Sequence, residues 1–267
     1  MRKTSIHFLP GLTVLAALLG IAPLSAGILG FNGGVGYTAN GGASFSGNSV
    51  TLTDGGFGEA RTAFFNTPQP ITAGWSASFV YKATNPGGIC FCDGAAFIFQ
   101  NSPAGQNAVG IGGGDYGYVG ITPSAAVEFT PDSAGLSPGG PGTGFYQNAT
   151  AQSSQISLIS TSPVLLNSMD PIMIAISYNG TVLFESLTDL TNGNTFSTSY
   201  TGVDLPTIVG GNTAFIGFSG GTGGGAAAQT ISDFSFVNPV PEPGSIFLLG
   251  SGLAGLLWRF RTKSGRA

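Results

Sequence analysis

Two acidic residues stand at the end of an apolar run, in the sequence AVEFTPDS. Glu128 and Asp132 are four residues apart, and clustered carboxylates can bind a cation or serve as general acid and base. A regular strand would place them on one face about 13 Å apart, whereas retaining glycoside hydrolysis needs carboxyl groups about 5 Å apart. The spacing therefore argues against hydrolysis. It leaves two interpretations, a metal-binding strand or a strand with a solvated charge at its end.

Few other side chains could carry chemistry. The only histidine, His7, lies in an N-terminal segment that we predict to be removed. Its loss excludes histidine-dependent triads, histidine general bases and ordinary catalytic zinc sites. Cys90 and Cys92 are the only cysteines, and because cysteines of exported proteins usually pair, we expect a disulfide in a tight loop, with two free thiols as the alternative. We expect no enzymatic activity.

The elements that would position these residues are strands. Residues 75–83 alternate, with Trp75, Ala77, Phe79 and Tyr81 on one face, as a half-buried strand does. Residues 171–189 read as two strands joined at Asn179–Gly180, and Asn192–Gly193 is a second hairpin signal. Further strands are predicted at residues 94–100, 116–121, 125–129, 213–220 and 229–237.

Residues 131–154 are rich in glycine, proline and serine, so we predict one long loop there. Structureless loops of this length are uncommon, which favours a ligand-facing role. With 45 glycines in the chain and no long helical pattern in its middle, a single all-β sandwich from about residue 28 to residue 237 is the economical prediction.

The charges are unevenly distributed along the chain. Arg61 and Lys82 are the only basic residues between the two termini, and all 12 acidic residues lie in that interior. The interior therefore carries a net charge of −10. Such a domain should repel nucleic acid and anionic membrane surfaces, so we predict no nucleic-acid partner.

Both termini have the pattern of targeting segments. Residues 1–26 join a basic start, an apolar stretch and small residues, which predicts a signal peptide, with a retained membrane anchor as the alternative. Near the other end, residues 245–258 would rise about 21 Å as a helix. This is shorter than the hydrocarbon core of a membrane, about 30 Å, and Trp258 would lie at the interface, with the basic tail on the cytoplasmic side.

The C-terminal segment, residues 239–267, resembles the PEP-CTERM sorting signal. The triplet Pro241-Glu242-Pro243 precedes the short apolar helix, and arginines follow it. The resemblance implies export, transient anchoring in the inner membrane and cleavage near the triplet by an exosortase, in a Gram-negative bacterium that makes exopolysaccharide. A plain C-terminal anchor is the alternative.

Residues 27–238, between these segments, resemble L-type (legume-like) lectins of bacteria. The resemblance rests on CDGAAFIFQN, on GIGGGDYGYVGI followed by PSAAVEF, on YNGT, and on the closing stretch PTIVGGNTAFIGFSGGTGGGAAAQTISDFSF. It implies a concanavalin-like jelly-roll sandwich that binds sugar at one end of its concave sheet.

The same resemblance implies which residues would contact a sugar. Asp93 matches the sugar-contacting acid, Gly112, Gly113 and Gly114 match a loop of backbone donors, and the turn containing Gly221, Thr222 and Gly223 matches the variable loop that sets sugar preference. Carboxylates and amides suit sugar hydroxyls because each hydroxyl both donates and accepts. Further acid or ring contacts could come from Asp115, Tyr116, Tyr118 and Tyr146, although packing is the commoner role of such tyrosines.

A degenerate metal site is the second implication. In plant members, the glutamate matched by Glu128 helps to bind a transition metal, and an aspartate two residues later bridges that metal to calcium. Thr130 stands at the bridging position, and Asp132 and Asn148 are partial substitutes. A threonine hydroxyl is a poor replacement for a bridging carboxylate, so we expect no cofactor, or one weakly bound calcium.

Together these observations predict an exported carbohydrate-binding protein of the cell surface or exopolysaccharide matrix. Its expected partners are a polysaccharide or other glycan and an exosortase. The alternative is a structural surface protein that keeps the lectin fold without binding sugar.

Overall fold

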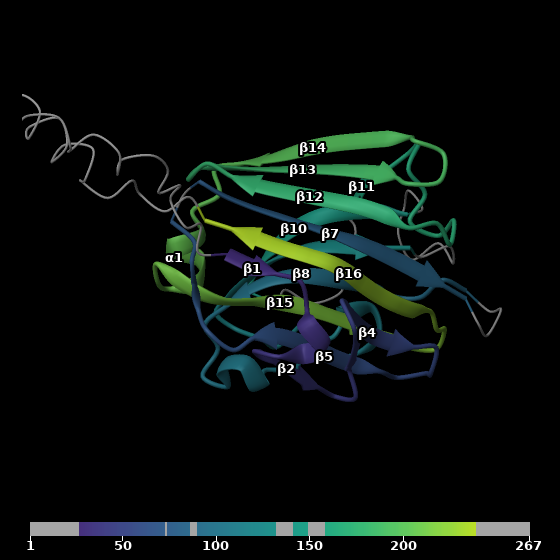
Figure 1. The fold of residues 1–267 in the computed structure, drawn as a ribbon, viewed down its shortest axis with the longest axis horizontal. Coiled ribbons are helices and arrows are strands. Elements are labelled where there is room, and N and C mark those ends of the chain that lie inside the picture. The colour runs from purple at the N-terminus through teal and green to yellow at the C-terminus, as the bar shows by residue number, and fades with distance from the viewer. Residues whose placement is uncertain (1–26, 73, 86–89, 132–140, 149–157, 239–267) are drawn as a thin grey trace, which may run out of the picture. The chain divides into compact units, whose positions relative to one another are not determined.

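The computed structural model describes residues 27–72, 74–85, 90–131, 141–148 and 158–238, which form two packed antiparallel β-sheets (Figure 1). The all-β sandwich predicted from the sequence is therefore confirmed. The predicted signal peptide and sorting segment lie outside the described residues. Within those residues, the α-helix α1 (Leu205–Val209) has five residues, and no helix combines the length and hydropathy of a membrane span.

Sheet I is one layer of the sandwich, and Figure 1 shows five of its strands, β14, β13, β12, β7 and β16, side by side. Strand β1 pairs with β16. In order across the sheet, with β1 last, the strands are β14 (Thr195–Thr201), β13 (Val182–Asp189), β12 (Ile172–Tyr178), β7 (Trp75–Thr84), β16 (Ala228–Val237), β4 (Ser49–Asp54), β3 (Ser44–Ser46) and β1 (Gly27–Leu29).

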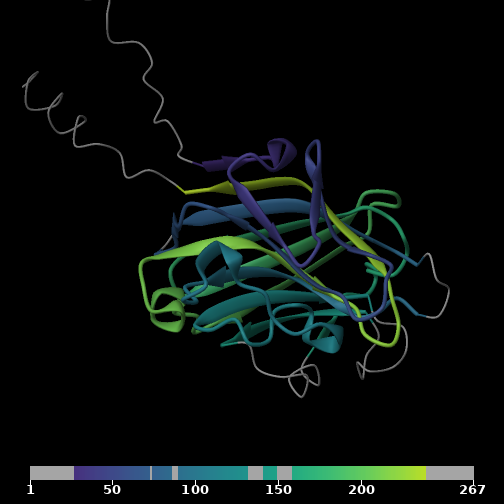
Figure 2. The same cartoon turned by 90° about the horizontal axis from the view of Figure 1, so that it is seen from below.

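Sheet II is the other layer, and Figure 2 shows its teal strands in a layer separate from the yellow β16. In order across the sheet, with β6 (which pairs with β15) last, the strands are β11 (Ile159–Ser160), β10 (Gly142–Gln147), β9 (Ser124–Thr130), β8 (Gly94–Gln100), β15 (Thr213–Gly221), β5 (Ala60–Phe65), β2 (Tyr37–Asn40) and β6 (Gln69–Pro70). Three short 3-10 helices complete the fold, η1 (Asn32–Gly34), η2 (Gly105–Asn107) and η3 (Gly113–Asp115).

The core between the sheets is aromatic. The alternation predicted for β7 is confirmed, because Trp75, Ala77, Phe79 and Tyr81 are all buried while Ser76 and Lys82 are exposed. The ring of Phe79 contacts rings from both sheets, among them Phe97 and Phe218 at centroid distances of 5.6 and 4.9 Å. Each aromatic side chain buried in this way contributes large apolar area, and its loss typically costs about 3–5 kcal/mol.

A second apolar cluster covers the outer face of sheet II. Tyr118 and Ile121, from the loop between β8 and β9, pack on strand residues such as Ile98 and Ala126. This packing holds the loop against the sheet. The loop carries Gly112, Gly113 and Gly114, so the cluster fixes the position of the predicted glycine loop.

Both hairpins predicted from Asn-Gly pairs are present. Strands β12 and β13 pair across Asn179–Gly180, and β13 and β14 pair across Asn192–Gly193. Gly180 and Gly193 have φ of 107° and 78°, values that favour glycine in a hairpin turn. The strands predicted at 94–100, 125–129, 213–220 and 229–237 correspond to β8, β9, β15 and β16.

The prediction of a strand at residues 116–121 is wrong. Tyr116, Gly117 and Gly120 have φ of 53°, 70° and 98°, which breaks an extended backbone. Within this turn the Gly110 N–H donates to the carbonyl oxygen of Gly117 at 2.9 Å. The aromatic side chains of Tyr116 and Tyr118 are buried by the packing of this turn, and their spacing does not reflect the alternation of a strand.

The single loop predicted for residues 131–154 is also wrong, because β10 lies within it and pairs with β9 along its whole length. Two of the glycines that suggested a loop lie in this strand, where neighbouring atoms leave no room for a side chain. A Cβ atom on Gly144 would lie 2.7 Å from the ring of Tyr146, and one on Gly142 would lie 2.8 Å from the carbonyl oxygen of Ile159. Glycine is therefore required there by close packing.

Candidate functional site

Asp93 stands at the entrance to β8, at one end of sheet II. The Cys92–Asp93 peptide bond is cis. The Asp93 N–H donates to the carbonyl oxygen of Gly221 at 3.2 Å, and the Asp93 carbonyl oxygen accepts from the hydroxyl of Thr130 at 3.0 Å. The neighbouring strands β15 and β9 therefore hold the backbone from which this carboxylate projects.

The two predicted glycine turns meet at Asp93. A Cβ atom placed on Gly223 would lie 3.1 Å from Oδ2 of Asp93 and 3.2 Å from Cα of Gly113. The Gly113 N–H donates to the carbonyl oxygen of Thr222 at 2.9 Å. The structure thus brings together three segments that are far apart in the sequence, with the Asp93 carboxylate lying against bare backbone.

Thr222 ties the loops together and does not face outward. Its side chain is fully buried, and its hydroxyl donates to the carbonyl oxygen of Gly56 at 2.7 Å and accepts from the N–H of Glu59 at 2.9 Å. The hydroxyl of Thr222 and the N–H of Gly113 are therefore engaged inside the protein. Gly221 and Asp93 are buried as well, whereas four of the predicted contacts are partly exposed, Gly112, Gly113, Gly114 and Gly223.

A disulfide braces the turn before Asp93. Cys90 and Cys92 are bonded, with their Cα atoms 5.5 Å apart, so the structure has the disulfide and not the two free thiols. A Cβ atom on Gly225 would lie 2.9 Å from Sγ of Cys92. Because only glycine fits there, the sulfur atoms pack directly on the turn that carries Gly223.

An exposed aromatic residue that the sequence analysis missed adjoins this site. The Gly58 N–H donates to the carbonyl oxygen of Gly223 at 3.2 Å, and the preceding residue, Phe57, is 63% exposed. An aromatic residue between glycines, in GGFGE, is the signal that would have found it. The tyrosines considered as ring contacts, Tyr116, Tyr118 and Tyr146, are all buried.

Glu128 is not a solvated charge at a strand end. Its side chain faces the same side of sheet II as Ala126, and the residue is 3% exposed. Burial, and to a lesser extent the nearby negative charge of Asp115, together raise the pKa of Glu128 from 4.5 to about 8. The carboxyl is therefore largely protonated and neutral at pH 7, so that burial carries no net charge into the protein.

The donor groups around Glu128 do not fit the two-metal arrangement of the plant members with which the sequence was compared. The Thr130 hydroxyl, at the bridging position, is buried and donates to Asp93. Asn148 is bonded to Ser124, as its N–H donates to the Ser124 carbonyl oxygen at 2.7 Å and its Oδ1 accepts from the Ser124 N–H at 3.3 Å. The described residues contain no group of three acidic, histidine or cysteine side chains placed to hold a metal ion, and Asp132 lies outside them.

Calcium is therefore expected to change the stability of the protein little. A ligand that binds the folded state stabilises it by RT ln(1 + [L]/Kd), which is small when Kd is near the calcium concentration. Thermal melts in EDTA and then in millimolar calcium should differ by less than about 10 °C, because roughly 1 kcal/mol corresponds to only a few degrees in a domain of this size. A larger shift would contradict this, and Glu128→Gln would then show whether Glu128 is a ligand.

A model of the PEP-CTERM protein-sorting motif matches residues 239–261. The matched segment includes the Pro-Glu-Pro triplet and the apolar stretch after it. The motif indicates an exported protein that is sorted to the cell envelope.

The sandwich is similar in structure to legume lectins. The lectin from Bauhinia forficata in complex with GalNAc superposes with a TM-score of 0.64 at 21% identity, covering 80% of this chain and 97% of that one. The basic winged bean lectin with Tn-antigen gives 0.66 at 18% identity, covering 80% and 98%. The peanut lectin with a nine-residue peptide gives 0.64 at 20% identity, covering 80% and 96%. The chain therefore combines a jelly-roll sandwich of the legume-lectin fold with a C-terminal PEP-CTERM sorting motif.

Proposed function

We propose that this protein is a carbohydrate-binding protein of the cell surface or exopolysaccharide matrix, and that Asp93 anchors the sugar. The observation that carries the proposal is the position of the Asp93 carboxylate against the backbone of Gly113 and Gly223. A sugar hydroxyl can donate to the carboxylate while its oxygen accepts from a backbone N–H of the glycine turns. Bonds to a charged acceptor are stronger than neutral ones.

The surroundings of Asp93 support a site that keeps its shape without a metal ion. The disulfide, the Thr130 hydroxyl and the internal bonds of Thr222 hold the loops in place of metal coordination. Such preorganisation lowers the entropy that binding must overcome. Phe57 is exposed and directly precedes Gly58, whose N–H donates to Gly223, and aromatic rings can cover the apolar face of a sugar.

A glycan array tests this function. The exported, processed protein is applied to the array with and without calcium. Selective binding to one group of glycans, unchanged by EDTA, is the expected result. If the protein binds no glycan on the array and no polysaccharide, the result would instead favour a structural surface protein. The presence of Thr130 in place of a bridging acid supports that alternative.

The sorting motif and the N-terminal pattern predict processing at both ends. The intact mass of the exported protein should correspond to a chain that starts near Gly27, the first residue of β1, and ends near Pro243 after cleavage by an exosortase. Transient anchoring by the apolar segment would precede that cleavage. Peptides from the basic C-terminal tail in the exported form would contradict the processing that we propose.

A further inference from the structure

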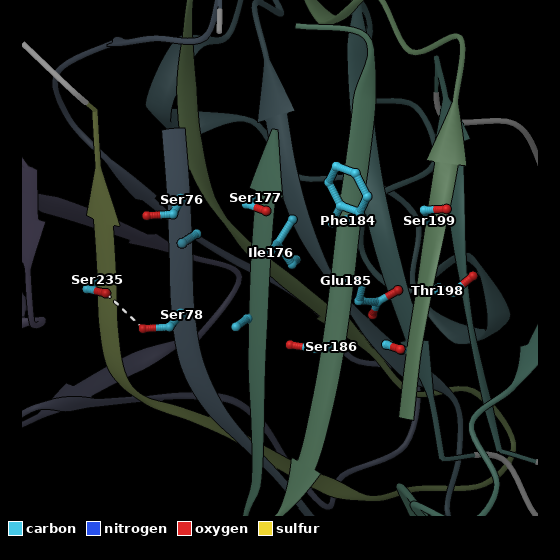
Figure 3. Close-up of a pocket in the computed structure, with 13 residues that line it drawn as sticks. Ser76, Ser78, Ile176, Ser177, Phe184, Glu185, Ser186, Thr198, Ser199 and Ser235 are labelled. Carbon is cyan, nitrogen blue, oxygen red and sulfur yellow. Dashed lines mark hydrogen bonds between the residues drawn. The ribbon is translucent and has the colours of Figure 1, made fainter. Parts of the chain in front are cut away.

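The outer face of sheet I contains a groove of about 720 Å³ (Figure 3), whereas the glycine turns lie at one end of sheet II. Strands β7, β12, β13 and β14 form its floor. The side chains of Ser78, Ala175, Ser186 and Ser197 stand side by side across these strands, so small side chains recur at the strand spacing of about 4.8 Å. Because these side chains are small, the face is hollow.

Most hydroxyl groups in the groove are available to a ligand. Ser78 is bonded to Ser235 at 2.9 Å, as the dashed line in Figure 3 shows. Five other serines line the groove and are exposed, and their side-chain hydroxyls make no hydrogen bond to any residue that the structure describes. These are Ser76, Ser177, Ser186, Ser197 and Ser199.

One aromatic ring stands among these hydroxyls. Phe184, on β13 between Ser177 and Ser199 in register, is 48% exposed and projects into the groove (Figure 3). Isolated exposed aromatic residues are common, but a ring within a field of unpaired hydroxyls matches the two surfaces of a sugar. Ring faces cover its apolar side, and hydroxyls exchange hydrogen bonds with its edge.

The groove presents no ionised side chain. Glu185 is the one acidic residue among those lining it, and its carboxyl points the other way, into the core, where it accepts from Thr143 and Tyr200. A charged polymer would gain nothing from such a surface and would lose part of its hydration. An uncharged ligand rich in hydroxyl groups is complementary to it.

A second copy of the chain fits this face poorly. A two-fold contact whose axis passes through the groove would place the groove opposite itself, so two hollows of about 720 Å³ would face each other across the interface. Voids of that size are foreign to packed interfaces, which reach the density of protein interiors. An elongated ligand fills the hollow, whereas a second copy leaves it open.

We propose that this groove binds a neutral polysaccharide chain, independently of the site at Asp93. The two sites lie on different sheets, so one protein would hold two glycan segments at once. Simultaneous engagement would increase avidity without any new contact, and it would let the protein cross-link a polysaccharide matrix.

Affinity electrophoresis tests the groove separately from the Asp93 site. The exported, processed protein carrying Asp93→Asn is run in native gels that contain dextran, galactomannan, mixed-linkage β-glucan or the neutral exopolysaccharide of the producing bacterium. At least one neutral polymer should retard this variant. Adding Phe184→Ala should weaken the retardation about tenfold, and Ala175→Arg, which fills the centre of the groove, should remove it.

The control is Leu165→Ala, which removes an apolar side chain that is also 48% exposed but lies outside the groove. It should leave retardation unchanged, and melting temperatures should show that every variant is folded. Absence of retardation in all the gels, or retardation by an anionic polymer alone, overturns the proposal. So does a dimer in sedimentation that Ala175→Arg dissociates, because a second copy would then cover the groove. If the groove does not bind a polysaccharide, the proposed function of Asp93 is unaffected. If Asp93 does not bind a glycan, the proposal for the groove is likewise unaffected.

Discussion

Asp93→Asn is expected to weaken glycan binding at the glycine turns by about tenfold to a hundredfold, or about 1.5–3 kcal/mol. The substitution keeps the shape of the side chain but removes its charge and turns one acceptor into a donor. Because neighbouring strands hold the Asp93 backbone, the altered side chain projects from the same position as the original carboxylate. The measurement is a titration with the best glycan from the array.

Glu128→Gln is the matched control for this loss of an acidic group. Glu128 is buried and largely neutral at pH 7, with a pKa of about 8, so an amide closely replaces its protonated carboxyl and binding should change little. Both variants must melt like the parent for the comparison to hold. Normal binding by Asp93→Asn together with loss of binding by Glu128→Gln would mean that β9 carries the site and that Asp93 does not.

The fold could be predicted to a large extent because its strands leave local signals. The alternation in β7 and the Asn-Gly turns around β13 are properties of neighbouring residues. Strand β10 left no such signal. Its glycines are required by contacts with Tyr146 and with Ile159, and the need for glycine at a close approach cannot be told from the need for glycine in a turn until the partner is known.

The candidate site could be predicted only in part. Asp93 and the turns containing Gly113 and Gly223 were found through resemblance, and the structure places them together. The roles within the site depend on burial, which the sequence does not give. Thr222 matched a variable contact loop but is buried and ties the loops together.

The groove on sheet I left no motif because its lining is spread over several strands. Each strand contributes one or two serines, which is ordinary for the outward face of any sheet. Only the register between strands brings the hydroxyls of Ser186 and Ser197 beside each other and near Phe184. Residues that form a surface through register alone cannot be recognised from their spacing in the sequence.

Glu185 gives the protein a stability that should fall as pH rises. Its side chain is buried between the sheets, accepting from the hydroxyl of Thr143 at 2.8 Å and from that of Tyr200 at 2.8 Å. Burial raises the pKa of Glu185 from 4.5 to about 7, although both hydrogen bonds act in the opposite direction. The folded state therefore holds this proton more tightly than the unfolded state does.

The sign of the effect follows from this difference. Below pH 4.5 the carboxyl of Glu185 is protonated in both states, and the favourable contribution is fully present; it is lost as pH rises through about 7. One pKa unit corresponds to about 1.4 kcal/mol, so this group alone should lower the free energy of unfolding by about 3 kcal/mol between pH 4.5 and pH 9. Glu128, with a pKa raised to about 8, titrates in the same interval, so the contribution of Glu185 is the difference between the parent and a variant that lacks this carboxyl.

Urea unfolding of the parent and of Glu185→Gln across that pH range measures the effect. The glutamine amide can accept from Tyr200 as the protonated carboxyl does, yet it cannot ionise, so the variant should lose about 3 kcal/mol less than the parent by pH 9. Asp233→Asn is the control, because Asp233 is an exposed acid with φ of 53°, a conformation that asparagine also adopts readily. It should leave the pH dependence as in the parent. Equal pH dependence in the parent and in Glu185→Gln would mean that Glu185 ionises in the folded protein as readily as in the unfolded chain, and that its burial between the sheets does not hold the proton.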